Sequence, residues 1–173
     1  MASALADRLL AIHAALDSAA IPHAFGGAIA LAYWTLEPRG TRDLDVNVFV
    51  SASDHQRAID ALPSSVDCPR DAGAQLARDG QGRLWWDDTP VDLFFNTDEF
   101  HEEAARRTQT VTFFGTAIPV LSALDLAVFK ALFDRTKDWA DIEAMFAART
   151  LDFEALCGQL DRLMPGEIGR AHV

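Results

Sequence analysis

Residues 43–50, with the sequence Asp-Leu-Asp-Val-Asn-Val-Phe-Val, place an aliphatic side chain at every even position. Successive side chains of a strand point to opposite faces of a sheet, so this period of two predicts a strand with one face in a core. Its other face carries the carboxylates of Asp43 and Asp45. Residues two apart on a strand lie roughly 6.6 Å apart at Cα, which allows both carboxylates to converge on one ion.

The segment Val91-Asp92-Leu93-Phe94-Phe95 alternates in a similar way and predicts a neighbouring strand that presents Asp92 to the same site. Carboxylate oxygens are the ligands that Mg²⁺ prefers. The two cysteines are isolated and the histidines are not clustered, so the spacing does not indicate zinc. A single Asp-x-Asp is usually solvated or bonded to a loop. The metal-site prediction therefore depends on all three carboxylates together.

Gly26-Gly27 closes a short apolar strand and opens the run 28–33, which has the composition of a helix. A glycine turn that leads into a helix offers backbone N–H groups and the positive end of the helix dipole to a phosphate. A tight turn without a ligand is the alternative interpretation of these two glycines.

The remaining patterns predict an α/β fold with a mixed (α+β) sheet in one domain, residues 1–173. A chain of 173 residues that is 50% apolar has enough material for one such core. We expect the core over about 20–121 and a C-terminal helical part over about 122–164. The predicted helices are 4–19, from the glycine pair to about 34, 53–62, 99–107, one containing Lys130 after a capping box at Ser122, 138–148 and 152–164. The predicted strands are 23–25, 110–114, 117–120 and a three-stranded meander over 75–96, and a polar tail follows residue 166.

The glycine pair, the Asp-x-Asp strand and the third Asp together resemble the DNA polymerase β-type nucleotidyltransferase superfamily. Within it, residues 39–45, Arg-Gly-Thr-Arg-Asp-Leu-Asp, are similar to the Arg-x-Thr-x-Asp-x-Asp signature of abortive-infection (AbiEii-like) nucleotidyltransferase toxins and their uncharacterised relatives. Residues 126–142, in which Lys130 precedes an Arg and a Lys-Asp-x-x-Asp, are similar to their downstream block. One departure is the gap between Gly27 and Asp43, which is longer than in the most compact members.

The resemblance implies a polymerase β-like nucleotidyltransferase domain that moves a nucleoside monophosphate from an NTP, such as ATP, to a hydroxyl acceptor. It implies Mg²⁺ or Mn²⁺ as the cofactor, held by the catalytic residues Asp43, Asp45 and Asp92. The phosphates of the NTP would be bound by Gly26, Gly27, Arg39 or Arg42, and Lys130. Asp138 and Asp141 have two interpretations, because they either bind substrate or cap a helix and pair with Arg135 or Lys137.

The net charge of −11, from 26 acidic and 15 basic residues, argues against a protein that follows an extended nucleic acid. A basic face would require Arg78, Arg83, Arg106 and Arg107 to meet in the fold. We therefore expect the acceptor to be a small molecule, a protein or an RNA end. No signal peptide or apolar run of membrane-spanning length is present, so a cytoplasmic protein without membrane contact is expected.

Two other functions are compatible with the sequence. One is a nucleotide-binding module that keeps the pocket without turnover, and the other is an acidic interaction protein of a toxin–antitoxin pair, with an antitoxin as partner. The presence of all three aspartates favours the enzyme.

Overall fold

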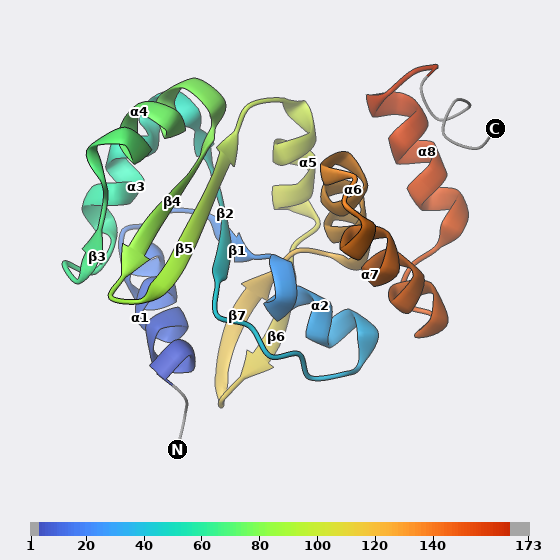
Figure 1. Cartoon of the computed structure of the whole chain (residues 1–173), viewed down its shortest axis with the longest axis horizontal. Helices are drawn as coiled ribbons and strands as arrows, with labels where there is room; N and C mark the ends of the chain where they lie inside the picture. Colours follow the sequence, from blue (N-terminus) through green and yellow to red (C-terminus); the bar gives the residue numbers. More distant parts are fainter. Residues whose placement is uncertain (1–3, 167–173) are drawn as a thin grey trace.

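The computed structural model describes residues 4–166 (Figure 1). Within this range the strands form a seven-stranded sheet in the order β3-β4-β5-β2-β1-β7-β6. The strands are β1 (His23–Phe25), β2 (Leu44–Ser51), β3 (Val66–Asp67), β4 (Gln81–Trp86), β5 (Thr89–Asn96), β6 (Gln109–Phe113) and β7 (Thr116–Val120). The pairs β2–β5 and β1–β7 are parallel and the other four are antiparallel. The mixed sheet confirms the predicted fold class.

The helices lie on both sides of this sheet. They are α1 (Ala4–Ser18), α2 (Gly27–Thr35), α3 (His55–Ala61) after the 3₁₀ turn η1 (Ala52–Asp54), α4 (Arg70–Asp79), α5 (Glu99–Arg106), α6 (Ala123–Phe133), α7 (Thr136–Ala147) and α8 (Phe153–Leu163). Figure 1 shows α6, α7 and α8 grouped at one side of the molecule, and α3 and α4 at the other side beside β3 and β4. The predicted tail after residue 166 lies outside the described residues. None of the described helices has the length and apolar composition that a membrane span requires.

The centre of the core is the parallel pair of β2 and β5. Leu44, Val46 and Val48 of β2 are at most 1% exposed, and they lie in register with buried residues of β5. Full burial of such a side chain stabilises the fold by about 1.5–3 kcal/mol. A slip of one residue would exchange these side chains with Asp45 and Asn47, so the core fixes the register. The same register fixes where the carboxylates emerge.

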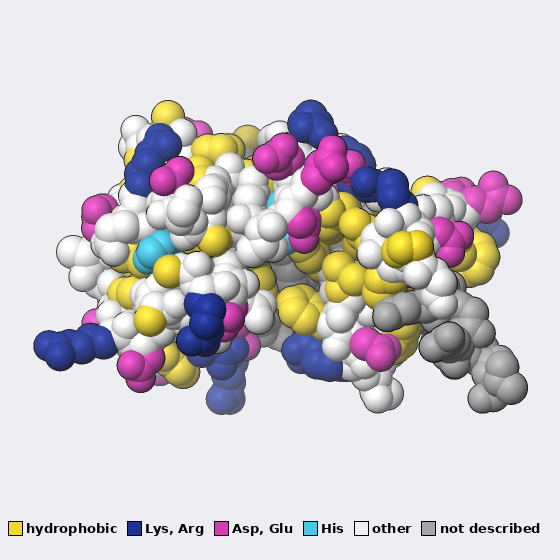
Figure 2. All heavy atoms as spheres, turned by 90° about the horizontal axis from the view of Figure 1, so that it is seen from above, with side chains coloured by type: hydrophobic (Ala, Val, Ile, Leu, Met, Phe, Trp, Pro, Cys, Tyr) yellow, Lys and Arg dark blue, Asp and Glu magenta, His cyan; other side chains and the backbone are white. Residues whose placement is uncertain are grey.

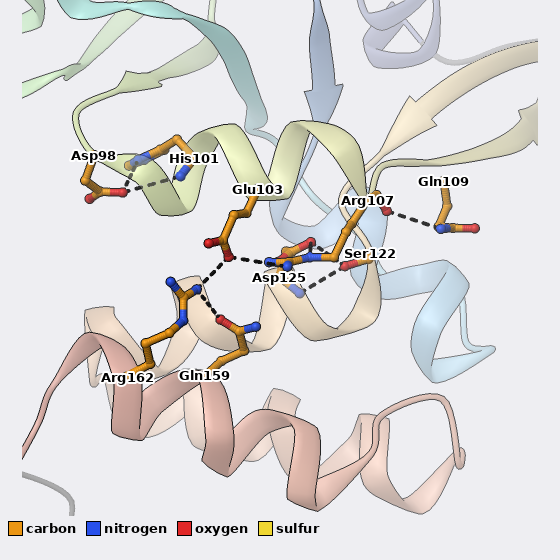
Figure 3. A network of polar contacts seen from close by, with 9 residues as sticks. All are labelled: Asp98, His101, Glu103, Arg107, Gln109, Ser122, Asp125, Gln159 and Arg162. Carbon is orange, nitrogen blue, oxygen red and sulfur yellow. Dashed lines mark hydrogen bonds and ion pairs between the residues drawn. The ribbon is translucent and has the colours of Figure 1, made fainter.

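A polar network sets the start of α6, the helix that carries Lys130. Ser122 accepts a hydrogen bond from the Asp125 backbone N–H at 3.1 Å, which confirms the predicted cap. The Asp125 carboxylate is fully buried and accepts hydrogen bonds from the Ser122 hydroxyl and the Arg107 guanidinium, both at 2.6 Å. Figure 3 shows these contacts, together with Glu103, which links α5 to Arg162 on α8. The network therefore anchors α6 against α5 and α8.

The predicted meander over 75–96 is wrong in its first third. Residues 70–79 form α4, and Gly80 ends that helix in the left-handed conformation, with φ of +70°. The apolar residues Ala72 and Leu76 are four apart and both buried, which is a helical spacing. Only β4 and β5 form strands in this segment. The other edge of β4 pairs with the two-residue β3, which lies before α4 and outside the predicted meander.

Candidate active site

The three predicted carboxylates meet on the open face of β2 and β5. Asp45 and Asp92 are register partners in this parallel pair, and Asp43 lies directly before β2. All three line one cleft with a volume of about 420 Å³. They reach it because the alternation that buries Leu44 and Leu93 turns the aspartates the other way.

The charge in this cleft acts most strongly on Asp45. Burial, followed by the negative charges of Asp92 and Asp43, raises the pKa of the Asp45 carboxyl to about 6, against an opposing effect of Lys130 and Arg83. The nearby cations therefore do not fully offset the carboxylates. A site of this kind favours the approach of a further cation, since a positive charge among the carboxylates relieves their repulsion.

Arg83 lies among the carboxylates from the neighbouring strand β4, where it is the register partner of Asp92. Its Nε and Nη2 donate to the two carboxylate oxygens of Asp92 at 2.7 and 2.8 Å. The same Nη2 lies 3.5 Å from Oδ2 of Asp43. The guanidinium thus pairs with two of the three aspartates.

The glycine pair begins α2 beside Asp45. The Gly26 backbone N–H donates to the Asp45 carbonyl oxygen at 2.9 Å, so this amide is already used within the protein. No side chain caps α2 at Gly26. The first N–H groups of a helix have no carbonyl partner in the helix, and here these include the amides of Gly27 and Ala28, which both line the cleft. The turn therefore presents amides to the cleft from Gly27 onward, rather than from Gly26.

Five charged side chains, which we call the charged network, line the part of the cleft formed by α6 and α7. The Nζ of Lys130 lies 2.8 Å from Asp141 and 3.4 Å from Asp138. Arg39 contacts Asp141 at 2.7 Å, and Arg135 contacts Asp138 at 2.6 Å. Three cations and two carboxylates leave the network with a net charge of +1.

Asp138 and Asp141 are held by this network. Burial acts to raise the pKa of Asp138, but the hydrogen bond from Arg135 and the charge of Lys130 hold it below its usual value. Asp138 is fully buried and Asp141 is 7% exposed. The geometry therefore favours pairing with cations over direct contact with substrate. Of the two predicted phosphate-binding arginines, Arg39 is among the described residues that line the cleft, whereas Arg42 is exposed and is not.

The three aspartates have the right chemistry for Mg²⁺ or Mn²⁺, because each supplies hard oxygen ligands and no His or Cys is among the described residues that line the cleft. The raised pKa of Asp45 also supports cation binding, because it shows that negative charge at this site is not fully compensated. As the side chains lie, no three acidic, His or Cys residues within 4–166 close on a common ion position. Asp43 and Asp92 face the guanidinium of Arg83 instead.

The position of Arg83 was not predicted. The segment Asp88-Thr89-Pro90 has the composition of a turn and predicts one there, whereas β4 and β5 are joined by the two residues Asp87 and Asp88. Asp87 has a positive φ of 52°, as two-residue hairpins require. An Asp-Asp pair between two alternating runs is the signal that would have placed Arg83 opposite Asp92.

The fold is similar to those of solved nucleotidyltransferase structures. ANT(2")-Ia in complex with adenylyl-2"-tobramycin aligns with a TM-score of 0.64 and 15% identity, over 93% of this chain and 99% of its own. The lincomycin-bound lincosamide antibiotic adenylyltransferase LnuA aligns at 0.56 and 13%, over 82% and 96%. An antigenic nucleotidyltransferase-like protein from Paracoccidioides brasiliensis aligns at 0.53 and 19%, over 92% and 89%.

No protein-family model matches the sequence, and no curated protein matches it. The likeness is therefore one of structure, and it extends over most of both chains in each comparison. It does not single out the abortive-infection toxins, so that closer resemblance stays a prediction. The chain has the fold of these nucleotidyltransferase structures.

Proposed function

We propose that this chain transfers a nucleoside monophosphate from an NTP to a hydroxyl acceptor. The observation that carries the proposal is the meeting of Asp43, Asp45 and Asp92 in one cleft with the N-terminus of α2 and the charged network. Nucleotidyl transfer needs these three elements together, because negative charge spreads over the phosphate oxygens in the transition state. A cleft that only bound a nucleotide would not need the third carboxylate.

In the proposed reaction the acceptor oxygen attacks the α-phosphorus, a new P–O bond forms, the bond to the β-phosphate breaks and pyrophosphate leaves. The amides of Gly27 and Ala28 would hold phosphate oxygens, and the charged network would offset the charge of the leaving pyrophosphate. Asp43 and Asp45 would hold Mg²⁺ together with the triphosphate. Asp92 would complete the ligand set of a second Mg²⁺, which would lower the pKa of the acceptor hydroxyl and orient it for attack. Bound Mg²⁺ would supply Lewis-acid stabilisation of the phosphate oxygens.

We propose a small hydroxyl compound as the first acceptor class to test, since the two antibiotic enzymes with this fold are described with adenylyl-tobramycin and lincomycin. The net charge of −11 also favours a compact acceptor over a long polynucleotide. A toxin role with an antitoxin partner draws no support from these two enzymes. If the acceptor is instead a protein or an RNA end, labelling in a cell extract would detect it, because the label would be found on that protein or RNA.

The test is incubation of the purified chain with each of the four α-³²P-labelled NTPs, Mg²⁺, and either a cell extract or a panel of hydroxyl compounds that includes tobramycin and lincomycin. We expect label in one product class with wild type. Asp45→Asn and Asp92→Asn should lower the rate by about 100-fold or more. Asp79→Asn is the matched control, since Asp79 is an exposed aspartate that pairs with Arg78 outside the cleft.

Unchanged transfer by both cleft variants would overturn the proposed roles. Specific, Mg²⁺-dependent NTP binding without transfer to any acceptor would favour a nucleotide-binding module.

A further inference from the structure

The guanidinium of Arg83 occupies both carboxylate oxygens of Asp92, at 2.7 and 2.8 Å. Such a bidentate, charge-assisted pair is a strong and directional contact. Its second interaction, with Asp43 at 3.5 Å, brings the same cation toward the other side of the site. The Asp45 carboxylate differs from these two, because no hydrogen bond from a described side chain reaches it.

A divalent ion bound by Asp92 and the guanidinium of Arg83 exclude each other. Mg²⁺ requires oxygen ligands at roughly 2.0–2.1 Å in an octahedral arrangement, and like charges repel at such short range. Both oxygens of Asp92 already face Arg83. Asp92 therefore binds either Arg83 or a metal ion, but not both in this geometry.

Arg83 is able to leave Asp92 without disturbing the core. Its side chain is 48% exposed, while that of Asp92 is 18% exposed. A second cavity, about 260 Å³ in volume, adjoins the cleft beside β4, and it is lined by Arg83, Asp92, Gln75 and Gln81, and by Asp45 and Arg135, among others. The Arg83 guanidinium carbon also lies 5.9 Å from the ring centroid of Trp85, which offers a cation–π contact. The released side chain thus has both space and partners.

We propose that Arg83 makes the two metal positions of this site unequal and sets their order of filling. The ion held by Asp45 and Asp43 binds first. The ion that uses Asp92 binds only when Arg83 moves from Asp92 toward the cavity beside β4. This inference rests on the proposed function, because it takes the three aspartates as metal ligands. It adds that the Arg83 guanidinium occupies the position of the second metal ion, beside Asp92, until the substrate complex forms.

The test measures Mn²⁺ binding and does not depend on turnover. The full chain is saturated with the non-hydrolysable analogue α,β-methylene-ATP, and free Mn²⁺ is followed by electron paramagnetic resonance. For wild type we expect one tight and one weaker Mn²⁺. Arg83→Gln should tighten the weaker Mn²⁺ by about 10-fold or more and leave the tight one unchanged. This follows because a gain of 10-fold corresponds to the loss of about 1.4 kcal/mol of competing interaction.

Three further variants make the result specific to Arg83 and Asp92. Arg78→Gln should bind Mn²⁺ like wild type, since Arg78 is an exposed arginine paired with Asp79. Arg83→Lys should give an intermediate affinity, because a lysine keeps the charge but loses the bidentate geometry. The double variant Arg83→Gln/Asp92→Asn should lose the gain. Circular dichroism melts of each variant establish that it is folded.

Equal or weaker binding of the second Mn²⁺ by folded Arg83→Gln would overturn the inference and leave the proposed function standing. Failure of every variant, wild type included, to bind Mn²⁺ in the presence of the analogue would overturn the metal-dependent function itself, and the inference with it.

Discussion

A Cβ atom placed on Gly27 would lie 1.9 Å from Oδ2 of Asp45. The turn at the start of α2 and the carboxylate on β2 therefore share one small space, although 18 positions separate them along the chain. Gly27 also has a positive φ of 49°, a conformation that residues with a Cβ adopt at a cost. Glycine is needed here both for the backbone conformation and for the approach of Asp45.

Gly27→Ala is expected to reduce nucleotidyl transfer by about 100-fold or more, because the new methyl group must displace the Asp45 carboxylate, and small displacements of reacting groups have effects of this size. The backbone conformation alone should cost about 1 kcal/mol of unfolding free energy. Transfer rates and urea unfolding of the purified variant measure the two effects.

The control for this change is Gly73→Ala. Gly73 lies inside α4 with no atom within 4 Å of the added Cβ. It should raise the unfolding free energy by about 0.5–1 kcal/mol and leave transfer unchanged. Full activity of Gly27→Ala would contradict this prediction. It would mean that the Asp45 carboxylate can move away from the new methyl group without loss of transfer.

The sequence alone predicted the strands and carboxylates at the centre of the site, because the alternation of Leu44, Val46 and Val48 with polar residues follows from local geometry. The cap at Ser122 was predicted for the same reason, since it depends on four consecutive residues. Features that depend on pairing across the sheet were missed. The contact between Arg83 and Asp92 requires the hairpin turn to be placed correctly, and an error of one residue in the turn changes every partner.

The burial of Lys130 between Asp138 and Asp141 could not be predicted from the sequence either. It depends on how α6 and α7 pack, and no local pattern encodes that geometry. The sequence gives the charges of Lys130, Asp138 and Asp141, but only the folded structure shows that these side chains pair with one another. That residues 1–173 form one domain stays a prediction.

Asp45→Asn is expected to stabilise the metal-free protein at neutral pH. The folded pKa of Asp45 is about 6, against a usual value of 3.8. A group with a raised pKa binds more protons in the folded state, so its contribution to stability is present below pH 3.8 and is lost as the pH rises to about 6. Asparagine removes that loss. We expect a gain of about 1–3 kcal/mol at pH 7.5 and a much smaller one at pH 4.

Urea unfolding in EDTA at the two pH values measures this difference, and the same variant at pH 4 is its own control. Because other groups titrate in this range as well, the quantity of interest is the difference between variant and wild type at each pH. A gain of the same size at both pH values would contradict the raised pKa of Asp45. Transfer by the variant should be about 100-fold or more below that of wild type at either pH.

Arg39→Gln is expected to weaken nucleotide binding without destabilising the fold. The Arg39 side chain is 40% exposed and lines the cleft through its contact with Asp141. Removal of this charge should raise the Kd for ATP with Mg²⁺ by about 10-fold, as expected for the loss of one charge-assisted contact with a phosphate. The melting-temperature shift caused by ATP plus Mg²⁺ should shrink accordingly.

Arg42→Gln is the matched control for this substitution. Arg42 lies three positions away in the same loop and does not line the cleft. The melting-temperature shift of the Arg42→Gln variant with ATP and Mg²⁺ should equal that of wild type. A larger effect of Arg42→Gln than of Arg39→Gln would show that the loop moves when nucleotide binds and that the other predicted arginine is the ligand.

Lys130→Met is expected to destabilise the protein even without nucleotide. Lys130 is 8% exposed and separates two buried carboxylates, which would keep only Arg39 and Arg135 as partners. Removal of one member of a buried ion pair leaves uncompensated charge, and we expect a loss of about 2 kcal/mol of unfolding free energy. Lys137→Met is the control, because Lys137 lines the same cleft but is exposed, and its effect should stay within about 0.5 kcal/mol. Equal melting temperatures for the two variants would contradict a structural role for Lys130.

We expect the protein to bind long polynucleotides weakly. Of the arginines that a basic face would need, Arg78 pairs with Asp79, Arg83 with Asp92, and Arg107 with Asp125. On the face drawn in Figure 2, basic and acidic side chains lie next to one another, which limits the positive potential there.

Each phosphate contact to a single strand changes log K by roughly 0.7 per decade of salt. With one to three contacts, a 20-nucleotide RNA should lose less than about 20-fold in affinity between 50 and 200 mM NaCl, as measured by fluorescence anisotropy. A loss of about 1,000-fold would instead show that these ion pairs open to form a basic surface, and it would make a polynucleotide the acceptor to test first.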